Sequence, residues 1–474
     1  MINEKIAVIG GLGTLSGADV LFKLLKNPKV LKNQKGYEFI FEQQPYSQIN
    51  SPLYHEDDIK SRKFYSYNLS KSFESKSVSK ILLPCFASHT FFEELQKEIS
   101  IPIVNIFDAL SLYLKSSFEK NVKIGILTSD YVKENHILKR YFQGYDLFFP
   151  TDQEHLMEAV YGENGIKKGY FDGIPLEYVY TACSELMDKG CEVIVPCVSE
   201  LSLVTEQLWK RGVPILDVNQ IYVDYALGNF TKDVLKPFKL GIVGGVGPSA
   251  TVDFMNKIII NTAAKRDQDH IKMIIEQNPQ IPDRTAHLIR KETDPTIAMF
   301  SICKKLEAAG VDAIAIPCNT AHAFVKSIQE HLTVPIINML TVTVEYINRN
   351  FGSNTKVGLL ATSGTVQSNV YLDVLTEFGF EVIIPDEEHQ KYVMESIYGE
   401  RGVKANFTAG ICKDNILKAV DFIIRKGADV IILGCTELPL MFPDESEIVN
   451  EDKIIPLVDP TLVLAKKIVN LSKV

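Results

Sequence analysis

In the segment KLGIVGGVGPSATVD, residues 239–253, a short apolar run enters a glycine-rich turn, and a segment of helical character follows. The apolar run is rich in β-branched residues and too short for a helix, which is typical of a buried parallel strand. The same arrangement stands near the amino terminus, in KIAVIGGLGTLSGAD at residues 5–19. Two such strand–turn–helix segments, far apart in one chain, indicate that a larger pattern is repeated.

Four further pairs of segments occur in the same order and at nearly constant separation. They are KILLPCFASH and AIAIPCNTAH, KIGILTSDYV and KVGLLATSGTV, YGENGIKKG and YGERGVKAN, and EVIVPCVSEL and DVIILGCTELPL. The sequence therefore predicts a tandem duplication, with one copy over residues 1–234 and a second over residues 235–474. The expected joint is the polar, proline-containing stretch GNFTKDVLKPFK at residues 228–239.

The alternation of short apolar runs with longer helical segments predicts an α/β fold in both copies. Each copy carries two strand–cysteine segments, one early and one late, so we expect two lobes per copy. Each lobe would hold a mostly parallel sheet flanked by helices. A ligand cleft is expected between the lobes, because ligands bind at the carboxyl ends of parallel strands in such sheets.

Charge and hydropathy narrow the class of protein. Of the 474 residues, 46% are hydrophobic and 23% are charged, and the net charge is −9. This acidic balance argues against nucleic acid or an anionic membrane as a partner. No apolar run approaches the roughly 20 residues that span a bilayer, and the amino terminus does not resemble a secretory signal. We expect a cytoplasmic protein.

The sequence offers no ligand set for a cofactor or a metal. The eight cysteines include no C-x-x-C pair, so neither a zinc ribbon nor a thioredoxin-type site is predicted. The glycine turn at residues 244–251 superficially fits a dinucleotide fingerprint, but the acidic residue expected about 20 positions later lacks a suitable strand context. We therefore expect no cofactor and no metal.

Cys318 and Cys435 each follow an apolar run directly, at the point where a strand would end and a helix begin. Backbone N–H groups and the helix dipole at such a place favour a thiolate. Two thiols presented by two lobes could remove a proton from one face of a carbon and return one to the other face. The alternative is that either cysteine is a small packing residue. His322 and His89, four residues beyond a cysteine, could polarise it, but we expect either helix-surface or hydrogen-bonded core histidines.

The second copy contains a series of five motifs: GGVGPSAT (244–251), PDRT (282–285), CNTAH (318–322), YGERGVK (398–404) and GCTEL (434–438). As a series they resemble the aspartate/glutamate racemase superfamily, nearest its aspartate racemases. The resemblance covers essentially the whole second half, and the first half follows it with gaps. It implies an amino-acid racemase that works without pyridoxal phosphate.

The resemblance also implies roles for particular side chains. Two cysteines would be the bases, the residues after them would bind the α-carboxylate, and a basic pair would hold the distal carboxylate of a small dicarboxylic amino acid. The matching positions are Cys318 and Cys435 for the bases, Asn319, Thr320 and Thr436 for the α-carboxylate, and Arg284 and Lys404 for the distal group. A guanidinium suits a carboxylate because it binds in bidentate fashion.

The first copy keeps some of these residues and loses others. It keeps Cys85, Cys197 and Lys167, whereas Phe86, Ala87 and Val198 stand at the expected places of the carboxylate-binding residues. The PDRT stretch aligns with QINS at residues 48–51, which contains no arginine. We expect this copy to be inactive and to pair with the second copy as a built-in dimer partner. The alternative is that it takes a different, less polar ligand.

The leading functional hypothesis is interconversion of L- and D-aspartate in the second copy, with glutamate as the near alternative. The same fold could act on another small acid, as a maleate isomerase does with two cysteines. A third hypothesis, from another class, is a non-catalytic protein that binds small acids. One methylene in a pocket leaves no trace in a sequence, so aspartate and glutamate stay undistinguished.

Overall fold

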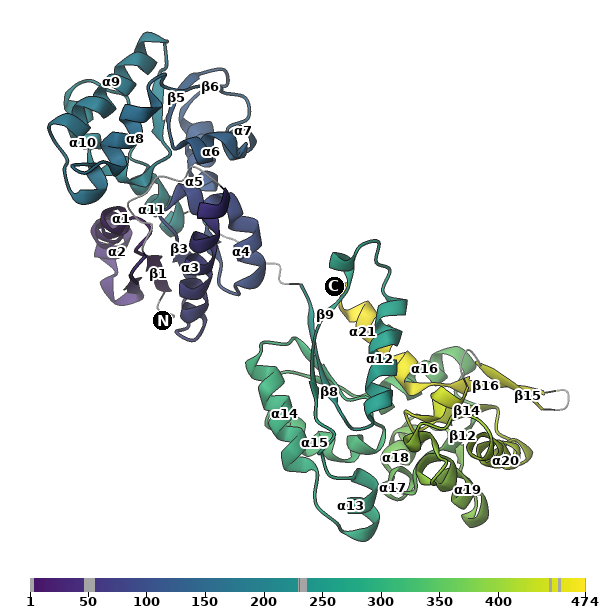
Figure 1. Ribbon diagram of the computed structural model, residues 1–474. Coiled ribbons are helices and arrows are strands. Elements are labelled where there is room, and N and C mark those ends of the chain that lie inside the picture. The colour runs from purple at the N-terminus through teal and green to yellow at the C-terminus, as the bar shows by residue number, and fades with distance from the viewer. Residues whose placement is uncertain are drawn as a thin grey trace. The chain divides into compact units, whose positions relative to one another are not determined.

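The computed structural model describes residues 4–46, 56–228, 230, 237–442, 446–450 and 453–473. The chain divides into two compact units, Met1–Lys236 and Pro237–Val474, named unit 1 and unit 2 below (Figure 1). The expected boundary between residues 234 and 235 and the QINS stretch both lie outside the described residues. Within the described part, no helix has the length and apolar character needed to cross a membrane.

Unit 1 contains two lobes, each built on a parallel sheet. The first sheet has the order β2-β1-β3-β4 and the second has the order β6-β5-β7. The strands are β1 (Glu4–Ile9), β2 (Tyr37–Glu42), β3 (Lys80–Leu82), β4 (Ile103–Val104), β5 (Lys123–Leu127), β6 (Asp146–Phe148) and β7 (Val193–Pro196). The helices are α1 (Thr14–Lys26), α2 (Pro28–Lys32), α3 (Glu56–Glu74), α4 (Phe92–Glu98), α5 (Ile106–Ser117), α6 (Asp130–Glu134), α7 (Ile137–Tyr141), α8 (Gln153–Tyr161), α9 (Ile174–Asp188), α10 (Thr205–Lys210) and α11 (Val218–Gly228).

Unit 2 repeats this plan with a larger second sheet. The sheet orders are β11-β10-β8-β9 and β13-β12-β14-β16-β15, and only the β15–β16 pair among them is antiparallel. The strands are β8 (Lys239–Gly244), β9 (Lys272–Gln277), β10 (Ala313–Ala315), β11 (Ile336–Ile337), β12 (Lys356–Leu360), β13 (Glu381–Ile383), β14 (Val430–Leu433), β15 (Glu447–Asn450) and β16 (Lys453–Val458). The helices are α12 (Pro248–Asn261), α13 (Arg284–Arg290), α14 (Thr296–Ala308), α15 (Val325–Gln329), α16 (Met339–Phe351), α17 (Ser363–Gln367), α18 (Val370–Glu377), α19 (Glu387–Tyr398), α20 (Ile411–Arg425) and α21 (Pro460–Leu471).

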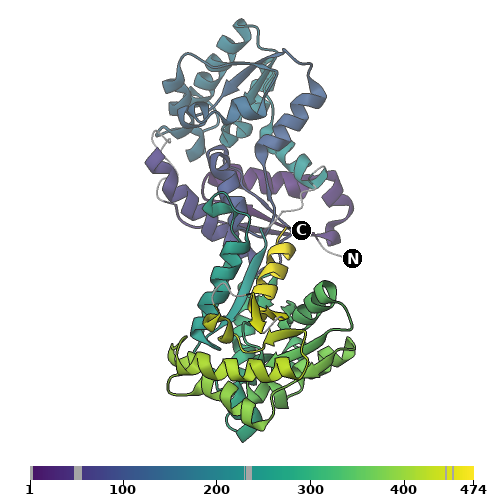
Figure 2. The ribbon, with the colours of Figure 1, turned by 90° about the vertical axis from the view of Figure 1, so that its right-hand side faces the viewer.

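The expected α/β fold, two lobes in each of two halves, is confirmed by these sheets. The central strands are buried along nearly their whole length, as the continuous apolar runs predicted. In unit 2 the last helix, α21, returns to the first lobe and packs beside α12 (Figure 2). Leu464 and Ile468 of α21 share a core with Leu240 and Ile242 of β8. This return ties the two lobes of unit 2 together.

The glycine turn after β8 is required by close backbone packing. Gly245 has a φ of +86°, and a Cβ built on it would lie 2.3 Å from the carbonyl carbon of Asn278. No other residue type has both the left-handed freedom and the space for this contact. Pro248 then occupies the first turn of α12, where its missing N–H costs nothing. The turn thereby positions the next glycine, Gly247, at the site described below.

Candidate active site

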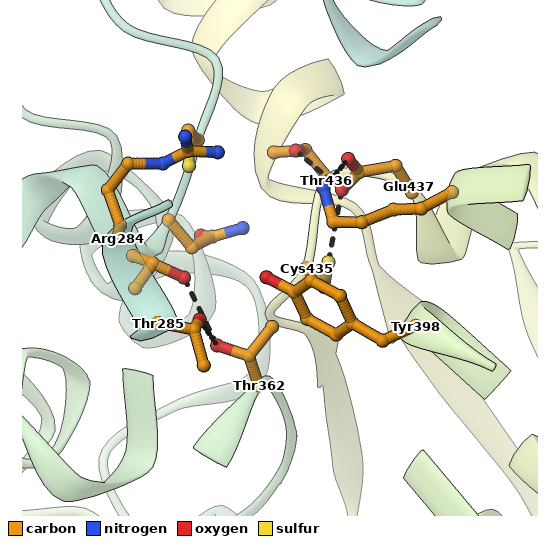
Figure 3. A pocket seen from close by; sticks show the side chains of 11 residues that line it. Arg284, Thr285, Thr362, Tyr398, Cys435, Thr436 and Glu437 are labelled. Atoms are coloured by element: carbon orange, nitrogen blue, oxygen red, sulfur yellow. Dashed lines mark hydrogen bonds and ion pairs between the residues drawn. The ribbon is translucent and has the colours of Figure 1, made fainter. Parts of the chain in front are cut away.

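A small cavity lies between the two lobes of unit 2, at the carboxyl ends of their strands (Figure 3). The cavity is narrow, and its side chains leave little free space between them. The lining residues come from both lobes and are mostly polar: Arg284, Thr285, Cys318, Asn319, Thr320, Thr362, Tyr398, Lys404, Cys435, Thr436 and Glu437. The structure brings all seven residues that the sequence singled out to this one cavity.

Short 3₁₀ helices, rather than α-helices, follow the two thiols. Cys318 comes after β10 and precedes the segment Thr320–Phe324, and Cys435 comes after β14 and precedes Leu438–Met441. Each 3₁₀ segment has one to two turns, so it lacks the aligned peptide dipoles of a long helix. The expectation that a helix dipole would favour a thiolate at both positions is therefore corrected. The immediate side-chain neighbours must set the charge state instead.

At Cys435 those neighbours favour the protonated thiol. The sulfur donates a hydrogen bond to Oε2 of Glu437 at 3.1 Å, and Glu437 forms an ion pair with Lys404. Burial and the charge of Glu437 raise the pKa of Cys435 well above its usual value, and the opposing effect of Lys404 is smaller. Cys435 thus rests as a proton donor with a carboxylate directly behind it.

Glu437 is ionised although it is buried. Burial raises its pKa, but the charge of Lys404 and the hydrogen bonds from Lys404 and Cys435 outweigh that effect and hold the pKa below its usual value. The same pairing raises the pKa of Lys404 against the effect of burial. Lys404 therefore enters the cavity already paired with a carboxylate, which the sequence did not indicate.

Arg284 stands at the start of α13 and faces the cavity from the first lobe (Figure 3). Its Nη1 donates to the carbonyl oxygens of Ile281 and Pro282, at 3.4 and 3.1 Å. Its Nε is buried and has no hydrogen-bond partner among the described residues. Burial lowers its pKa, but the nearby Cys318 and Asp283 raise it by more, so the guanidinium stays charged. A buried charged donor without a partner is a strong attractor for a carboxylate.

Asn319 has a second donor of this kind. Its Oδ1 accepts a hydrogen bond from the Tyr371 hydroxyl at 2.7 Å, which fixes the amide, and its Nδ2 is buried without a partner in the described chain. Thr320 has its hydroxyl 2.7 Å from that of Thr365 and 3.1 Å from that of Thr362. These groups can therefore donate to a bound anion from the first lobe.

Four further residues line the cavity that were not expected there from the sequence: Thr285, Thr362, Tyr398 and Glu437. Tyr398 and Glu437 stand inside the quoted motifs YGERGVK and GCTEL, and both recur in the first copy as Tyr161 and Glu200. Their recurrence in both copies was the signal that could have identified them. His322 lies in the core, which is one of the two places expected for it. Its two ring nitrogens are 2.9 Å from the Cys318 carbonyl oxygen and 3.1 Å from the Met339 nitrogen, and burial lowers its pKa to about 4.

Gly247 links the glycine turn to Glu437. It has a φ of +116°, and a Cβ built on it would lie 2.5 Å from Oε1 of Glu437. Gly247→Ala should therefore displace Glu437 and lower turnover, in addition to the cost of about 1–2 kcal/mol for a left-handed alanine. Gly352→Ala is the matched control, because Gly352 has a φ of +85° with no atom within 4 Å of its built Cβ.

Melting temperature and kcat/KM of both variants test this contact. We expect similar losses of melting temperature but a fall in kcat/KM for Gly247→Ala alone. Equal activity of the two variants would show that Gly247 serves only the backbone.

Unit 1 has a corresponding cavity, but its strand register differs from the sequence comparison. Strand β7 pairs with β5, and the amide of Cys197 donates to the carbonyl of Leu127 at 2.7 Å. Strand β14 pairs with β12 in the same register, and there the amide of Gly434 donates to the carbonyl of Leu360 at 2.7 Å. Cys197 therefore occupies the position of Gly434.

The equivalence of Cys197 with Cys435 is thus corrected. One residue further along, Val198 stands where unit 2 has Cys435, and Ser199 stands where it has Thr436. Burial raises the pKa of Cys197 far above its usual value, which leaves an inert protonated thiol. Unit 1 has no second thiol at the position that a two-base reaction requires.

The cleft between the lobes of unit 2 combines two thiols with a buried guanidinium, an arrangement typical of enzymes that use acid–base chemistry. The model of the Asp/Glu/hydantoin racemase family matches residues 9–226 and 243–468. The chain belongs to this family, which includes amino-acid racemases that work without pyridoxal phosphate.

Individual relatives match about half of the chain or less. The broad specificity amino-acid racemase RacX of Bacillus subtilis is 30% identical over 243 residues, 49% of this chain and 96% of that protein. A glutamate racemase of Sulfurihydrogenibium is 31% identical over 132 residues, 28% of this chain and 48% of that protein. Among solved structures, the Picrophilus torridus aspartate racemase has 31% identity and a TM-score of 0.43, covering 50% of this chain and 94% of that one.

Proposed function

We propose that unit 2 interconverts L- and D-aspartate without a cofactor, with glutamate as the near alternative, and that Cys318 and Cys435 are its two bases. The observation that carries this proposal is the shared cavity: two thiols from different lobes line it together with Arg284, whose buried Nε has no partner in the described chain. Inversion by direct proton transfer needs an acid–base group on each face of Cα, and a guanidinium with an unused donor suits the distal carboxylate of an acidic amino acid.

In this proposal the substrate is held at two ends. Its distal carboxylate binds Arg284, and Lys404 contributes charge while it remains paired with Glu437. The α-carboxylate accepts hydrogen bonds from Asn319, Thr320 and Thr436. The unpaired Nδ2 of Asn319 supports this part, because a carboxylate would satisfy a donor that is otherwise buried at a cost.

The proton balance of one turnover is simple. Cys318, as a thiolate, removes the Cα proton from one face, and the Cys435 thiol delivers its proton to the other face. Cys435 is then a thiolate and Cys318 a thiol, so the enzyme is set for the opposite enantiomer. The starting state returns when Cys318 releases its proton to solvent and Cys435 takes one up from solvent. Glu437, hydrogen bonded to Cys435 at 3.1 Å, is placed to pass that solvent proton to the sulfur.

Exchange in heavy water tests the reaction directly. L- and D-aspartate are incubated separately with the full chain in D₂O, and deuterium at Cα is followed in substrate and product by NMR. We expect deuterium in the inverted product from either enantiomer, because the donating thiol has exchanged with solvent. Absence of exchange for aspartate and for glutamate would contradict the proposal.

Broader specificity is the second candidate, because RacX is a broad specificity amino-acid racemase that this chain covers over 96% of its length. The same exchange experiment with alanine, serine and leucine distinguishes broad specificity from specificity for aspartate. If neutral amino acids are inverted as fast as aspartate, the assignment of Arg284 and Lys404 to a distal carboxylate is wrong. Isomerisation of maleate, or binding without exchange, would indicate the two alternatives considered from the sequence.

Unit 1 is proposed not to racemise, since Val198 replaces the second base. The double variant Cys85→Ala/Cys197→Ala should keep aspartate racemisation nearly unchanged in the full chain. The initial rate of racemisation is measured from each enantiomer for the variant and for the parent protein. Their melting temperatures are compared to exclude a folding defect. A fall of half or more would mean that unit 1 contains a working site. The pairing of the two units as an internal dimer stays a prediction.

A further inference from the structure

The cavity of unit 1 retains a charged group that the sequence comparison did not reveal. The cavity has about 330 Å³ of empty volume. It is lined by Leu12, Arg62, Cys85, Phe86, Ala87, Ser129, Val132, Tyr161, Lys167, Cys197, Val198, Ser199 and Glu200. Arg62 comes from α3, a different element from the one that supplies Arg284 in unit 2. It nevertheless donates from Nη1 to the sulfur of Cys85 at 3.4 Å.

Arg62 is almost completely buried, with 2% of its surface exposed. Its Nε and Nη2 have no hydrogen-bond partner among the described residues, although the Tyr46 ring lies 5.5 Å from the guanidinium carbon. Burial lowers the pKa of Arg62, but the effects of Cys85, Tyr161 and Tyr46 together raise it, so the charge persists. A buried guanidinium with two unused donors is costly unless an anion binds it.

The second cation of this cavity is already used. Lys167 forms a buried ion pair with Glu200, and its Nζ also donates to the Leu12 carbonyl oxygen at 3.2 Å. This pair matches that of Lys404 and Glu437 in unit 2. Arg62 is therefore the cation in the cavity that can form an ion pair with a negatively charged ligand.

Part of the wall of the unit 1 cavity is apolar where the wall of the unit 2 cavity is polar. The strand registers place Phe86 and Ala87 at the positions of Asn319 and Thr320. Val198 stands at the position of Cys435, as shown above. A second carboxylate on a ligand would lose its water against these apolar side chains without new hydrogen bonds. An apolar group would gain from the same contacts.

We propose that unit 1 is a binding site for small monocarboxylates with a short apolar body, with the carboxylate on Arg62 and the apolar body against Phe86, Ala87 and Val198. The site binds without inverting its ligand, because Cys85 is the one thiol at a position that corresponds to a base of unit 2. This site is separate from the racemase site and does not depend on the substrate proposed for unit 2.

Isothermal titration of the full chain with isobutyrate, and with succinate for comparison, tests the site. The titrations are carried out in the Arg284→Met background, which removes the free guanidinium of unit 2. We expect isobutyrate to bind one site per chain, and succinate to bind at least 10-fold more weakly. Arg62→Met should weaken isobutyrate binding at least 10-fold, because the neutral side chain fills similar volume but offers no donor.

A second variant tests the same site in case Arg62→Met does not fold. Ala87→Asp leaves Arg62 in place and introduces a carboxylate into the cavity, where it repels an anionic ligand and competes for the guanidinium. It should abolish isobutyrate binding without lowering the melting temperature of the chain. The proposal is overturned if isobutyrate does not bind, if both variants bind it like the parent, or if succinate binds as tightly as isobutyrate.

Discussion

Replacing either cavity thiol of unit 2 with serine, in Cys318→Ser or Cys435→Ser, is expected to abolish racemisation in both directions. A serine hydroxyl holds its proton too tightly to act as a base at neutral pH. Proton transfer by a positioned side chain typically contributes about 10²–10⁴-fold in rate, and inversion requires both thiols in the same turnover. We therefore expect kcat to fall by at least about 10³-fold in each variant, with little change in fold.

The matched control is Cys303→Ala. Cys303 lies in α14, is fully buried, and has its pKa raised to about 12 by burial, so it is a packing thiol. Its removal should cost some stability and leave kcat nearly unchanged. Circular dichroism of all three variants separates misfolding from loss of the base. Near-normal turnover in either serine variant would refute the two-base mechanism, whatever the substrate.

Arg284→Ala is expected to have the second largest effect. The guanidinium is buried with an unused donor, so an acidic substrate loses a charged hydrogen bond when this residue is removed. Such a bond contributes about 1.5–3 kcal/mol, which corresponds to a fall of about 10- to 100-fold in kcat/KM for aspartate. Because the bond is made to a distal carboxylate, exchange of alanine should change much less.

Arg266→Ala provides the comparison, because Arg266 is an exposed arginine paired with Asp269 outside the cavity. It should leave both substrates unaffected. Steady-state kinetics of aspartate and alanine, measured for the parent and both variants, give the required ratios. Equal losses for the two amino acids would place Arg284 at the α-carboxylate or at Cys318, not at the distal group.

The two units differ in the thiols of their cavities, but each cavity is lined by a buried arginine. A shift of one position around Cys197 puts Val198 at the position of Cys435, so a cysteine in the motif does not by itself place a thiol there. Arg62, from a separate helix, supplies the guanidinium that QINS does not. A buried positive charge is thus present in both cavities, while the thiol at the position of Cys435 is present in unit 2 alone.

The sequence alone determined the duplication, the α/β class and the convergence of Cys318 and Cys435 on one cleft. These features follow from short-range patterns, because apolar runs define parallel strands and the carboxyl ends of such strands meet at one edge. Arg284 and Lys404 were also found in the cavity, since each stands within a recognisable motif.

How those side chains are partnered became visible in the tertiary structure alone. The ion pair of Lys404 with Glu437 joins residues 33 positions apart, and no local pattern encodes which cation meets which carboxylate. The same carboxylate accepts the hydrogen bond from Cys435. The position of Arg62 beside Cys85 depends on how α3 packs against the first sheet. The position of Cys197 depends on strand register, because a shift of one residue along a strand turns a side chain to the other face of the sheet.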